Sequence, residues 1–214
     1  MTIVPHEIDI GKFRPETPRQ LAYDESGVKI YAFPVIHALA GSMGFRLEWK
    51  GLTFVYTADS QPSTFEADQG KGADVFIHEI FPSAEEFAHY NHMPIQAAEG
   101  VMEEHTTPAE LGQVYGIAKP RLGVGRHFTL DENLIDPLFQ RWRTTYDGPV
   151  LLMQDLTTIN VTSDYIVVRQ TRADQLAWPA PPPKPPAGLD MSIGEPSKAQ
   201  RPAWLTATGI SEDS

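Results

Sequence analysis

The chain has 214 residues, of which 28 are acidic and 17 basic, so its formal charge is −11 with neutral histidine. A hydrophobic content of 41% is typical of a globular domain that buries a core, and the length predicts a single domain. The acidity argues against general nucleic-acid binding, because neutralising phosphates requires clustered Lys and Arg. The chain has no cysteine, so any metal must be held by His, Asp and Glu.

The sequence contains no predicted membrane segment or leader. No stretch reaches the roughly 18 uninterrupted apolar residues that a membrane-spanning helix requires. The N-terminus, MTIVPHE, has no basic segment followed by an apolar run, so it does not resemble a signal peptide. We therefore expect a cytoplasmic protein.

Hydrophobic periodicity predicts an α/β domain over residues 1–176. Strands are expected where apolar residues alternate or run together, over 28–33, 45–49, 52–56, 74–78, 121–125, 150–153 and 165–169. Helices are expected where apolar residues recur at helical spacing, over 94–104, from 108 onward and over 133–145. Lys50–Gly51 separates two alternating runs and predicts a tight hairpin turn. Thr107 is expected as the N-cap of the second helix, with Pro108 at its first position.

The composition changes in the last part of the chain. Residues 180–186 read APPPKPP, which cannot donate the backbone hydrogen bonds of a helix or sheet and favours polyproline geometry. We expect residues 177–214 to form a Pro-rich tail that drapes over the domain or is disordered. A ligand for a proline-recognition domain is the alternative.

Polar side chains follow four of the expected strands, at the ends where α/β architectures place their sites. They are His37, Asp59, the pair His78–Glu79, and His127. A lone histidine in such a position is more often structural, but four repetitions favour a site. Neutral imidazoles with a carboxylate suit zinc and, where coordination positions stay open, also iron or manganese. Asp59 is the candidate to bridge two metal ions.

These residues fall within a recognisable succession of motifs. In chain order they are Pro34–His37, Gly44–Glu48, Val55–Ser60, Ala73–Glu79, His105–Pro108 and Arg126–Phe128. The succession resembles the C-terminal half of the metallo-β-lactamase-fold hydrolases, in particular their ribonuclease Z and arylsulfatase-like branch, over roughly Pro5 to Arg169. The resemblance implies the C-terminal part of an αβ/βα sandwich, a mixed β-sheet with flanking helices.

The resemblance also implies roles for the site residues. His37, Asp59 and His127 would be metal ligands, with Asp59 bridging up to two Zn²⁺ ions; Mn²⁺ and Fe²⁺ are alternatives. His78 would lie near the leaving group with Glu79 orienting it, and His105 would support the site through a histidine-plus-hydroxyl motif. Ala58 stands where the family usually has glycine before the bridging aspartate.

The His-x-His-x-Asp-His run that defines the family is absent, and the chain resembles a fold entered near its middle. The first interpretation is a hydrolase of small-molecule esters (phosphodiester, sulfate ester or lactone) that is incomplete as given. The second is a non-catalytic half-domain that binds or oligomerises, and the third is a mononuclear metal protein with residual esterase activity. Because half a sandwich exposes an apolar sheet face, we expect a homodimer or pairing with a missing N-terminal half.

Overall fold

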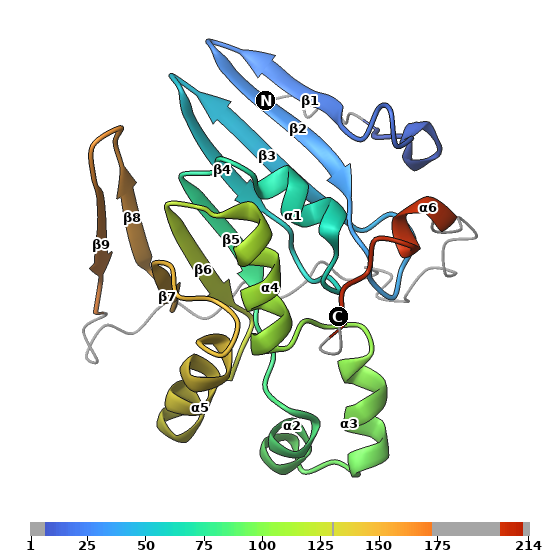
Figure 1. Cartoon of the computed structure of the whole chain (residues 1–214), viewed down its shortest axis with the longest axis vertical. Coiled ribbons are helices and arrows are strands. Elements are labelled where there is room, and N and C mark those ends of the chain that lie inside the picture. The colour runs from blue at the N-terminus through green and yellow to red at the C-terminus, as the bar shows by residue number, and fades with distance from the viewer. Residues whose placement is uncertain (1–6, 130, 173–201, 212–214) are drawn as a thin grey trace, which may run out of the picture.

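The computed structural model describes residues 7–129, 131–172 and 202–211. Its centre is a seven-stranded sheet with helices on one face and a separate hairpin on the other (Figure 1). The strands are β1 (Gln20–Glu25), β2 (Val28–Pro34), β3 (Met43–Trp49), β4 (Leu52–Tyr56), β5 (Val75–Glu79), β6 (Leu122–Arg126) and β7 (Val150–Leu152), with β8 (Thr157–Val161) and β9 (Ile166–Gln170) in the hairpin. The helices are α1 (Thr64–Gly70), α2 (Ala84–Asn91), α3 (Ile95–Met102), α4 (Pro108–Ala118), α5 (Glu132–Trp142) and α6 (Ala203–Thr206), with a 3₁₀ turn at Ile10–Lys12.

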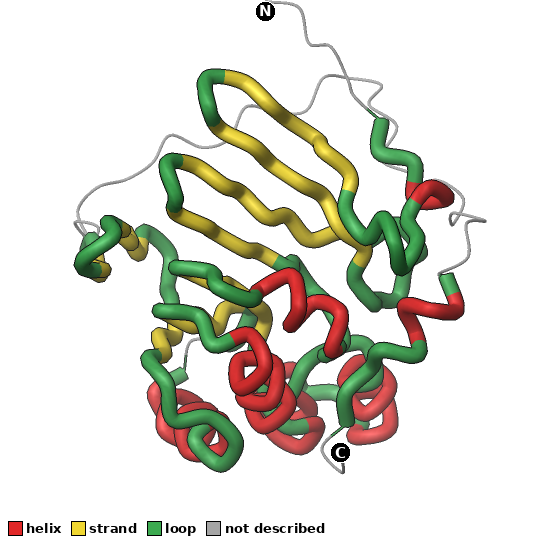
Figure 2. The backbone as a smooth tube through the Cα atoms, turned by 45° about the horizontal axis from the view of Figure 1, so that its top comes forward, coloured by secondary structure: helices red, strands yellow, loops and turns green. Residues whose placement is uncertain are grey.

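The sheet has two halves with different connections. Strands β1 to β4 form an antiparallel meander, and β4 to β7 are parallel, in the spatial order β1 to β7. Figure 2 shows the strands side by side as one layer, with the helices beside it. Helices connect the parallel strands, so β4, β5 and β6 all end at the same edge of the sheet. Residues that follow these three strands are therefore brought together.

The turn between β3 and β4 confirms the predicted hairpin. Lys50 and Gly51 have φ of 47° and 78°, and Trp49 pairs with Leu52 across a two-residue loop. Positive φ at both central positions matches the twist of the flanking strands, which is why glycine is favoured there.

Two apolar clusters hold the layers together. The larger lies between the sheet and helices α1, α4 and α5, and includes the fully buried Phe76, Tyr115 and Trp142. The smaller lies on the opposite face, where Val75 and Val124 of the sheet pack against residues of the β8–β9 hairpin. The predicted α/β class, a mixed sheet with flanking helices, is confirmed.

Most expected elements are present, with shifts at their ends. The helix expected over 94–104 is α3, and Thr107 caps α4 with Pro108 in its first turn. The helix expected over 133–145 is α5, which begins at Glu132 and ends at Trp142. It accommodates Pro137 beyond its first turn. Strand β1, helices α1 and α2, and strand β8 were not expected.

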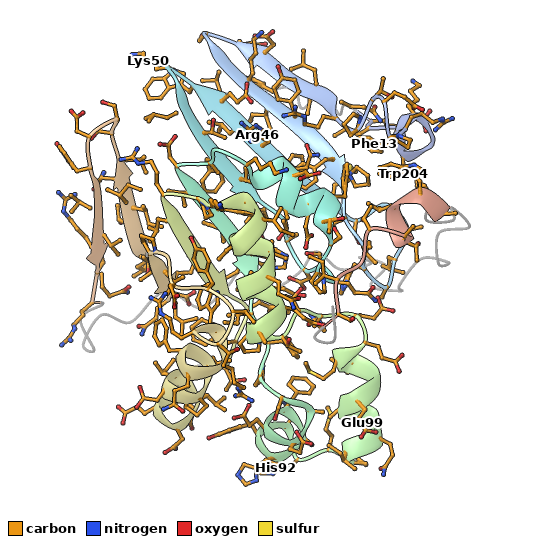
Figure 3. The ribbon with its side chains drawn as sticks, in the orientation of Figure 1. Phe13, Arg46, Lys50, His92, Glu99 and Trp204 are labelled. Carbon is orange, nitrogen blue, oxygen red and sulfur yellow. The ribbon has the colours of Figure 1, made fainter. Side chains whose placement is uncertain are left out.

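Part of the expected tail packs against the domain. The Thr208 carbonyl accepts a hydrogen bond from the Thr64 backbone N–H at 2.7 Å, and Trp204 of α6 lies edge-on to Phe65, 5.1 Å between ring centroids (Figure 3). The Pro-rich segment 180–186 lies outside the described residues. None of the helices among residues 7–129, 131–172 and 202–211 is long and apolar enough to cross a membrane.

Candidate functional site

The candidate site forms where the parallel strands end. Asp59 follows β4, Glu79 is the last residue of β5, and His127 directly follows β6. His37 comes from the loop after β2, and His105 lies shortly before α4. Ala58 and His127 adopt left-handed backbone conformations, with φ of 61° and 64°, so the chain turns sharply as it leaves β4 and β6.

Glu79 is the centre of the site. Its buried carboxylate accepts hydrogen bonds from the backbone N–H groups of Ser60 and Thr106, both 3.1 Å from Oε1. On the other oxygen, Oε2, it accepts from His105 Nδ1 at 2.7 Å and His127 Nδ1 at 3.2 Å. Four donors therefore converge on one carboxylate.

This arrangement fixes the charge of Glu79. Burial acts to raise the pKa of Glu79, but the hydrogen bonds from His105 and His127 lower it to about 2. The side chain is therefore ionised at neutral pH and is an acceptor only. It follows that both imidazoles carry a proton on Nδ1, which leaves Nε2 as the nitrogen able to bind a ligand.

Two other imidazoles lie close to that of His105. The His105 ring centroid is 5.3 Å from that of His37 and 5.4 Å from that of His127. Phe81 stacks on His105 in parallel, 4.1 Å between centroids and 7° between planes. The Nδ1 atom of His37 lies 3.0 Å from the carbonyl oxygen of Glu104. The three histidines are thus gathered into one region.

Asp59 sits beside His127 and is paired with a cation. Its Oδ1 accepts a hydrogen bond from Arg126 Nη2 at 2.7 Å and lies 3.5 Å from His127 Nδ1. The Arg126 guanidinium also lies over the Tyr56 ring, 4.9 Å from its centroid. The hydrogen bond to Glu79 raises the pKa of His127. Burial acts to lower this pKa, and the negative charge of Asp59 acts to raise it.

Among the described residues, one group of three has the arrangement of a metal site. Glu79, His105 and His127 each offer a ligand atom, and these atoms lie within 4.8 Å of one another. A carboxylate with two imidazoles is a suitable donor set for a divalent transition metal, so the residues fit such an ion. Of the predicted ligands His37, Asp59 and His127, the group contains His127. The ligand roles of the other two stay predictions.

His78 lies apart from these residues. It is 0% exposed, and its Nε2 lies 2.9 Å from Glu66 Oε1, while Nδ1 donates to the Glu79 carbonyl oxygen at 2.8 Å. Burial acts to lower the pKa of His78, but the charge of Glu66 and the hydrogen bond with Glu66 outweigh it, so the pKa of His78 is raised. Its predicted role near a leaving group stays a prediction, since the structure gives it no contact with solvent.

The pairing of Glu79 with His105 and His127 was not foreseen. Successive side chains of a strand point to opposite faces, so Glu79 and His78 cannot face the same way. The apolar residues of β5 carry this signal: Val75 and Ile77 belong to the cluster under the hairpin, and Phe76 to the cluster under the helices. This alternation places His78 with Phe76, away from Glu79.

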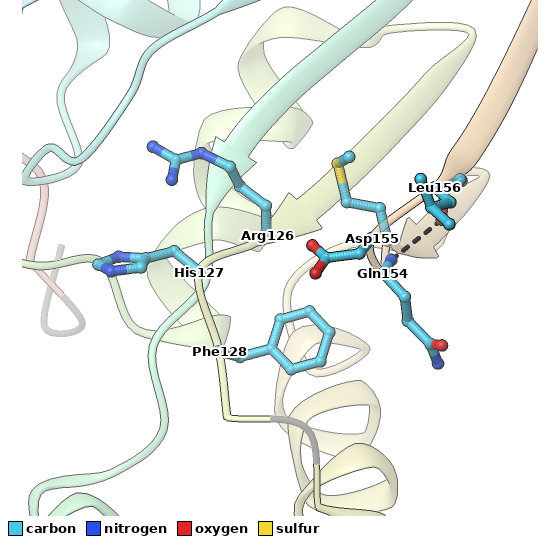
Figure 4. A pocket seen from close by; sticks show the side chains of 8 residues that line it. Arg126, His127, Phe128, Gln154, Asp155 and Leu156 are labelled. Atoms are coloured by element: carbon cyan, nitrogen blue, oxygen red, sulfur yellow. Dashed lines mark hydrogen bonds between the residues drawn. The ribbon is translucent and has the colours of Figure 1, made fainter. Parts of the chain in front are cut away.

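Two hollows meet at His127. The larger, of about 440 Å³, is shown in Figure 4 and is lined by Arg126, His127, Phe128, Met153, Gln154, Asp155, Leu156 and Thr157. The smaller, of about 180 Å³, is lined by Phe81, Pro82, Phe87, His127, Phe128 and Thr129. Phe128 borders both, so a molecule bound at His127 can extend to either side of this ring.

No protein-family model matches the chain, and no curated protein matches it by sequence. Solved structures do. The chain is 19% identical to the metallo-β-lactamase fold protein YhfI from Bacillus subtilis, with a TM-score of 0.48, over 73% of this chain and 54% of that one. For CmlA, a diiron β-hydroxylase from Streptomyces venezuelae, the identity is 10% and the TM-score 0.42, over 61% and 31%. For a long form RNase Z from yeast, the identity is 17% and the TM-score 0.37, and the match covers 49% of this chain and 15% of that one.

The chain spans about half the length of the Bacillus protein and less of the other two. Each of these likenesses covers only part of the chain, with an identity below 20% and a TM-score below 0.5.

Proposed function

We propose that this chain carries the catalytic residues of a metal-dependent hydrolase of ester-type substrates. The observation that carries the proposal is the convergence of the Glu79 carboxylate with His105 and His127 at one edge of the sheet. Zn²⁺ suits this donor set, with Mn²⁺ and Fe²⁺ as alternatives. The substrate classes under consideration are phosphodiesters, sulfate esters and lactones.

When bound, such an ion supplies a nucleophilic hydroxide at neutral pH and polarises the ester oxygen. The residues of the chain hold it in place. Glu79 fixes the ring orientation and tautomer of both His105 and His127, as outer carboxylates do for metal-binding histidines. Phe81 restricts the His105 ring by stacking on it. Asp59 places a second carboxylate beside His127.

The proposal is tested by metal content and turnover together. The full chain is equilibrated with Zn²⁺, and bound metal is measured in the wild type, in His105→Ala and in His127→Ala. We expect about one ion per chain in the wild type, a loss in both variants, and hydrolysis of p-nitrophenyl esters that follows the metal. His89→Ala is the control, because His89 is exposed on α2. Equal metal content in all four proteins would refute the proposal.

A second candidate function is a binding or oligomerisation module, and the exposed sheet face favours it. On the face away from the helices, Tyr23, Trp49 and Phe54 are 42%, 41% and 37% exposed. A hollow of about 210 Å³ lies between this face and β8. Soluble monomers rarely leave such a surface uncovered. A second copy of this chain or another polypeptide would cover it, and light scattering on the purified chain tests for the dimer.

A further inference from the structure

The guanidinium of Arg126 brings a permanent positive charge to the candidate site. Arg126 is the last residue of β6, directly before His127, and it pairs in register with Glu79 of β5. In Figure 4 the side chains of Arg126 and His127 extend to the same side, opposite to that of Gln154. The strand end therefore sends a cation and an imidazole into one region.

Two contacts fix the position of this guanidinium. Its Nη2 donates to Asp59 Oδ1 at 2.7 Å, and the group lies over the Tyr56 ring, 4.9 Å from the centroid. Because β5 lies between β4 and β6, the Arg126 side chain spans β5 to reach both partners. The side chain is 20% exposed, and within the part of the chain that the structure describes its Nε is buried without a hydrogen-bond partner. The carboxylate and the ring together offset the burial of this charge.

The ion pair competes with a metal ion for Asp59. A guanidinium stays protonated in proteins, so its charge cannot be lost by deprotonation. An ion bound by Asp59 would lie next to this fixed charge and would also deprive the guanidinium of its carboxylate, which is costly for a largely buried cation. The sequence resemblance implies that Asp59 bridges two metal ions. The pairing of Asp59 with Arg126 argues against that role.

The charges of the group also favour a single ion. The carboxylates of Glu79 and Asp59 face one guanidinium, which leaves an excess of one negative charge when the imidazoles are neutral. One divalent ion turns this excess into one positive charge. A second divalent ion would add two more positive charges to a region partly shielded from solvent, where repulsion between cations is strong.

We propose that Arg126 takes the place of a second metal ion at Asp59, so that the chain binds a single divalent ion through the group that contains His127. This inference rests on the proposed function for that ion, and it adds the number of ions and the role of Arg126. Arg126 holds the Asp59 carboxylate beside His127, where Oδ1 lies 3.5 Å from Nδ1. Asp59 is then a charged neighbour of the ion and not its ligand.

The metal content of the full chain at saturating Zn²⁺ tests the inference. Arg126→Met removes the charge and keeps an unbranched side chain, whereas Arg126→Lys keeps the charge. We expect about one ion per chain in the wild type and in Arg126→Lys, and about two in Arg126→Met. Combining Arg126→Met with Asp59→Asn should remove the additional ion. Arg169→Met is the control, because Arg169 is exposed on β9, and it should bind metal as the wild type does.

Two ions in the wild type, with the second lost in Asp59→Asn, would overturn the inference and leave the proposed function in place. Equal metal content in the wild type and in Arg126→Met, shown by circular dichroism to be folded, would also overturn it. No bound ion in the wild type would refute the proposed function and this inference with it.

A second measurement needs no variant. The wild type saturated with Mn²⁺ should give the electron paramagnetic resonance spectrum of isolated ions. The spectrum of an exchange-coupled pair of Mn²⁺ ions would overturn the inference, because it requires two ions close together at the site.

Discussion

Replacing the Glu79 carboxylate by an amide tests the centre of the site. The pKa of Glu79 falls from its ordinary 4.5 to about 2 in the folded chain. At about 1.4 kcal/mol per pH unit, this difference corresponds to about 3 kcal/mol of folding free energy at neutral pH. The side chain is fully buried, so solvent does not reduce this value greatly. Glu79→Gln should therefore lower the free energy of unfolding at pH 7 by about 3 kcal/mol.

The pH dependence separates the charge from other effects of the substitution. Because the folded pKa is lowered, the stabilisation by Glu79 is complete above pH 4.5 and is lost as pH falls through about 2. The difference between wild type and Glu79→Gln should therefore shrink as the pH falls from 4.5 to 2. The amide also turns two of its own N–H groups toward the converging donors, which adds a cost that does not vary with pH.

The measurement is urea unfolding of the metal-free chain between pH 7 and pH 2. Glu99→Gln is the matched control, because Glu99 is exposed on α3 and should change stability by less than about 0.5 kcal/mol (Figure 3). Our account of Glu79 would be wrong if Glu79→Gln were as stable as Glu99→Gln at pH 7. It would also be wrong if the difference stayed constant down to pH 2.

Four further predictions concern the same edge of the sheet and the helices behind it. Ala58→Gly should raise stability by about 1 kcal/mol in thermal unfolding, because Ala58 has a φ of 61° and glycine adopts this conformation without strain; a lower melting temperature would contradict this. Zn²⁺ affinity should decrease as the pH is lowered from 8 to 5.5, and the decrease should already have begun before the pH reaches 6.5. The hydrogen bond to Glu79 raises the pKa of His127, so the proton on His127 competes with the metal over this range. Calorimetry measures the affinity, and a constant affinity down to pH 5.5 would exclude His127 as a ligand. Asp59→Asn should weaken Zn²⁺ binding by less than about threefold if Glu79, His105 and His127 form the site, whereas a loss of two orders of magnitude would favour Asp59 as a direct ligand. Gly112→Ala should lower the free energy of unfolding by about 2 kcal/mol, because a Cβ there would lie 1.9 Å from Thr145 Oγ1 and 3.0 Å from the Trp142 carbonyl oxygen. Gly116→Ala, in the same helix, places its Cβ where no atom lies within 4 Å and should raise the free energy of unfolding slightly. Equal effects of the two substitutions would show that the α4–α5 contact can relax.

Hydrophobic periodicity predicted the elements whose buried residues form a clear apolar pattern. Strand β5 could be predicted from VFIHE and β6 from LGVGR, because strands covered on both faces read as near-continuous apolar runs. Strand β1, with the sequence QLAYDE, was not predicted from the sequence, because most of its residues are exposed at the edge of the sheet. Its existence depends on pairing with β2, which a local pattern does not contain.

Helices α1 and α2 are short, and α2 buries no residue fully, so neither shows a strong apolar stripe. Their starts were nevertheless marked in the sequence. Ser63 with Glu66 and Ser83 with Glu86 are both capping boxes in which the two residues satisfy each other's backbone N–H groups. A search for this spacing, rather than for periodicity alone, would have found both helices.

The candidate site was predictable in its region but not in its pairings. The ends of the apolar strands indicated His37, Asp59, Glu79 and His127, and the structure gathers these residues with His105 at one edge. Which side chains touch depends on distances between loops that sequence spacing does not set. Arg126 illustrates this, because its pairing with Asp59 joins residues 67 positions apart.

The hydrogen bonds of Glu79 also decide how the site would hold an ion. Ligation through Glu79 Oε2 would displace the two imidazole N–H groups that donate to it, so the binding energy would have to offset two charge-assisted hydrogen bonds. Ligation through Nε2 of His105 and His127 keeps both bonds and uses the tautomer that Glu79 already imposes. The lowered pKa of Glu79 shows that these bonds stabilise the fold, so removing them costs stability as well as orientation. A Glu79 ligand would therefore cost part of the stability that these bonds supply, whereas binding through the Nε2 atoms of His105 and His127 would leave the bonds in place.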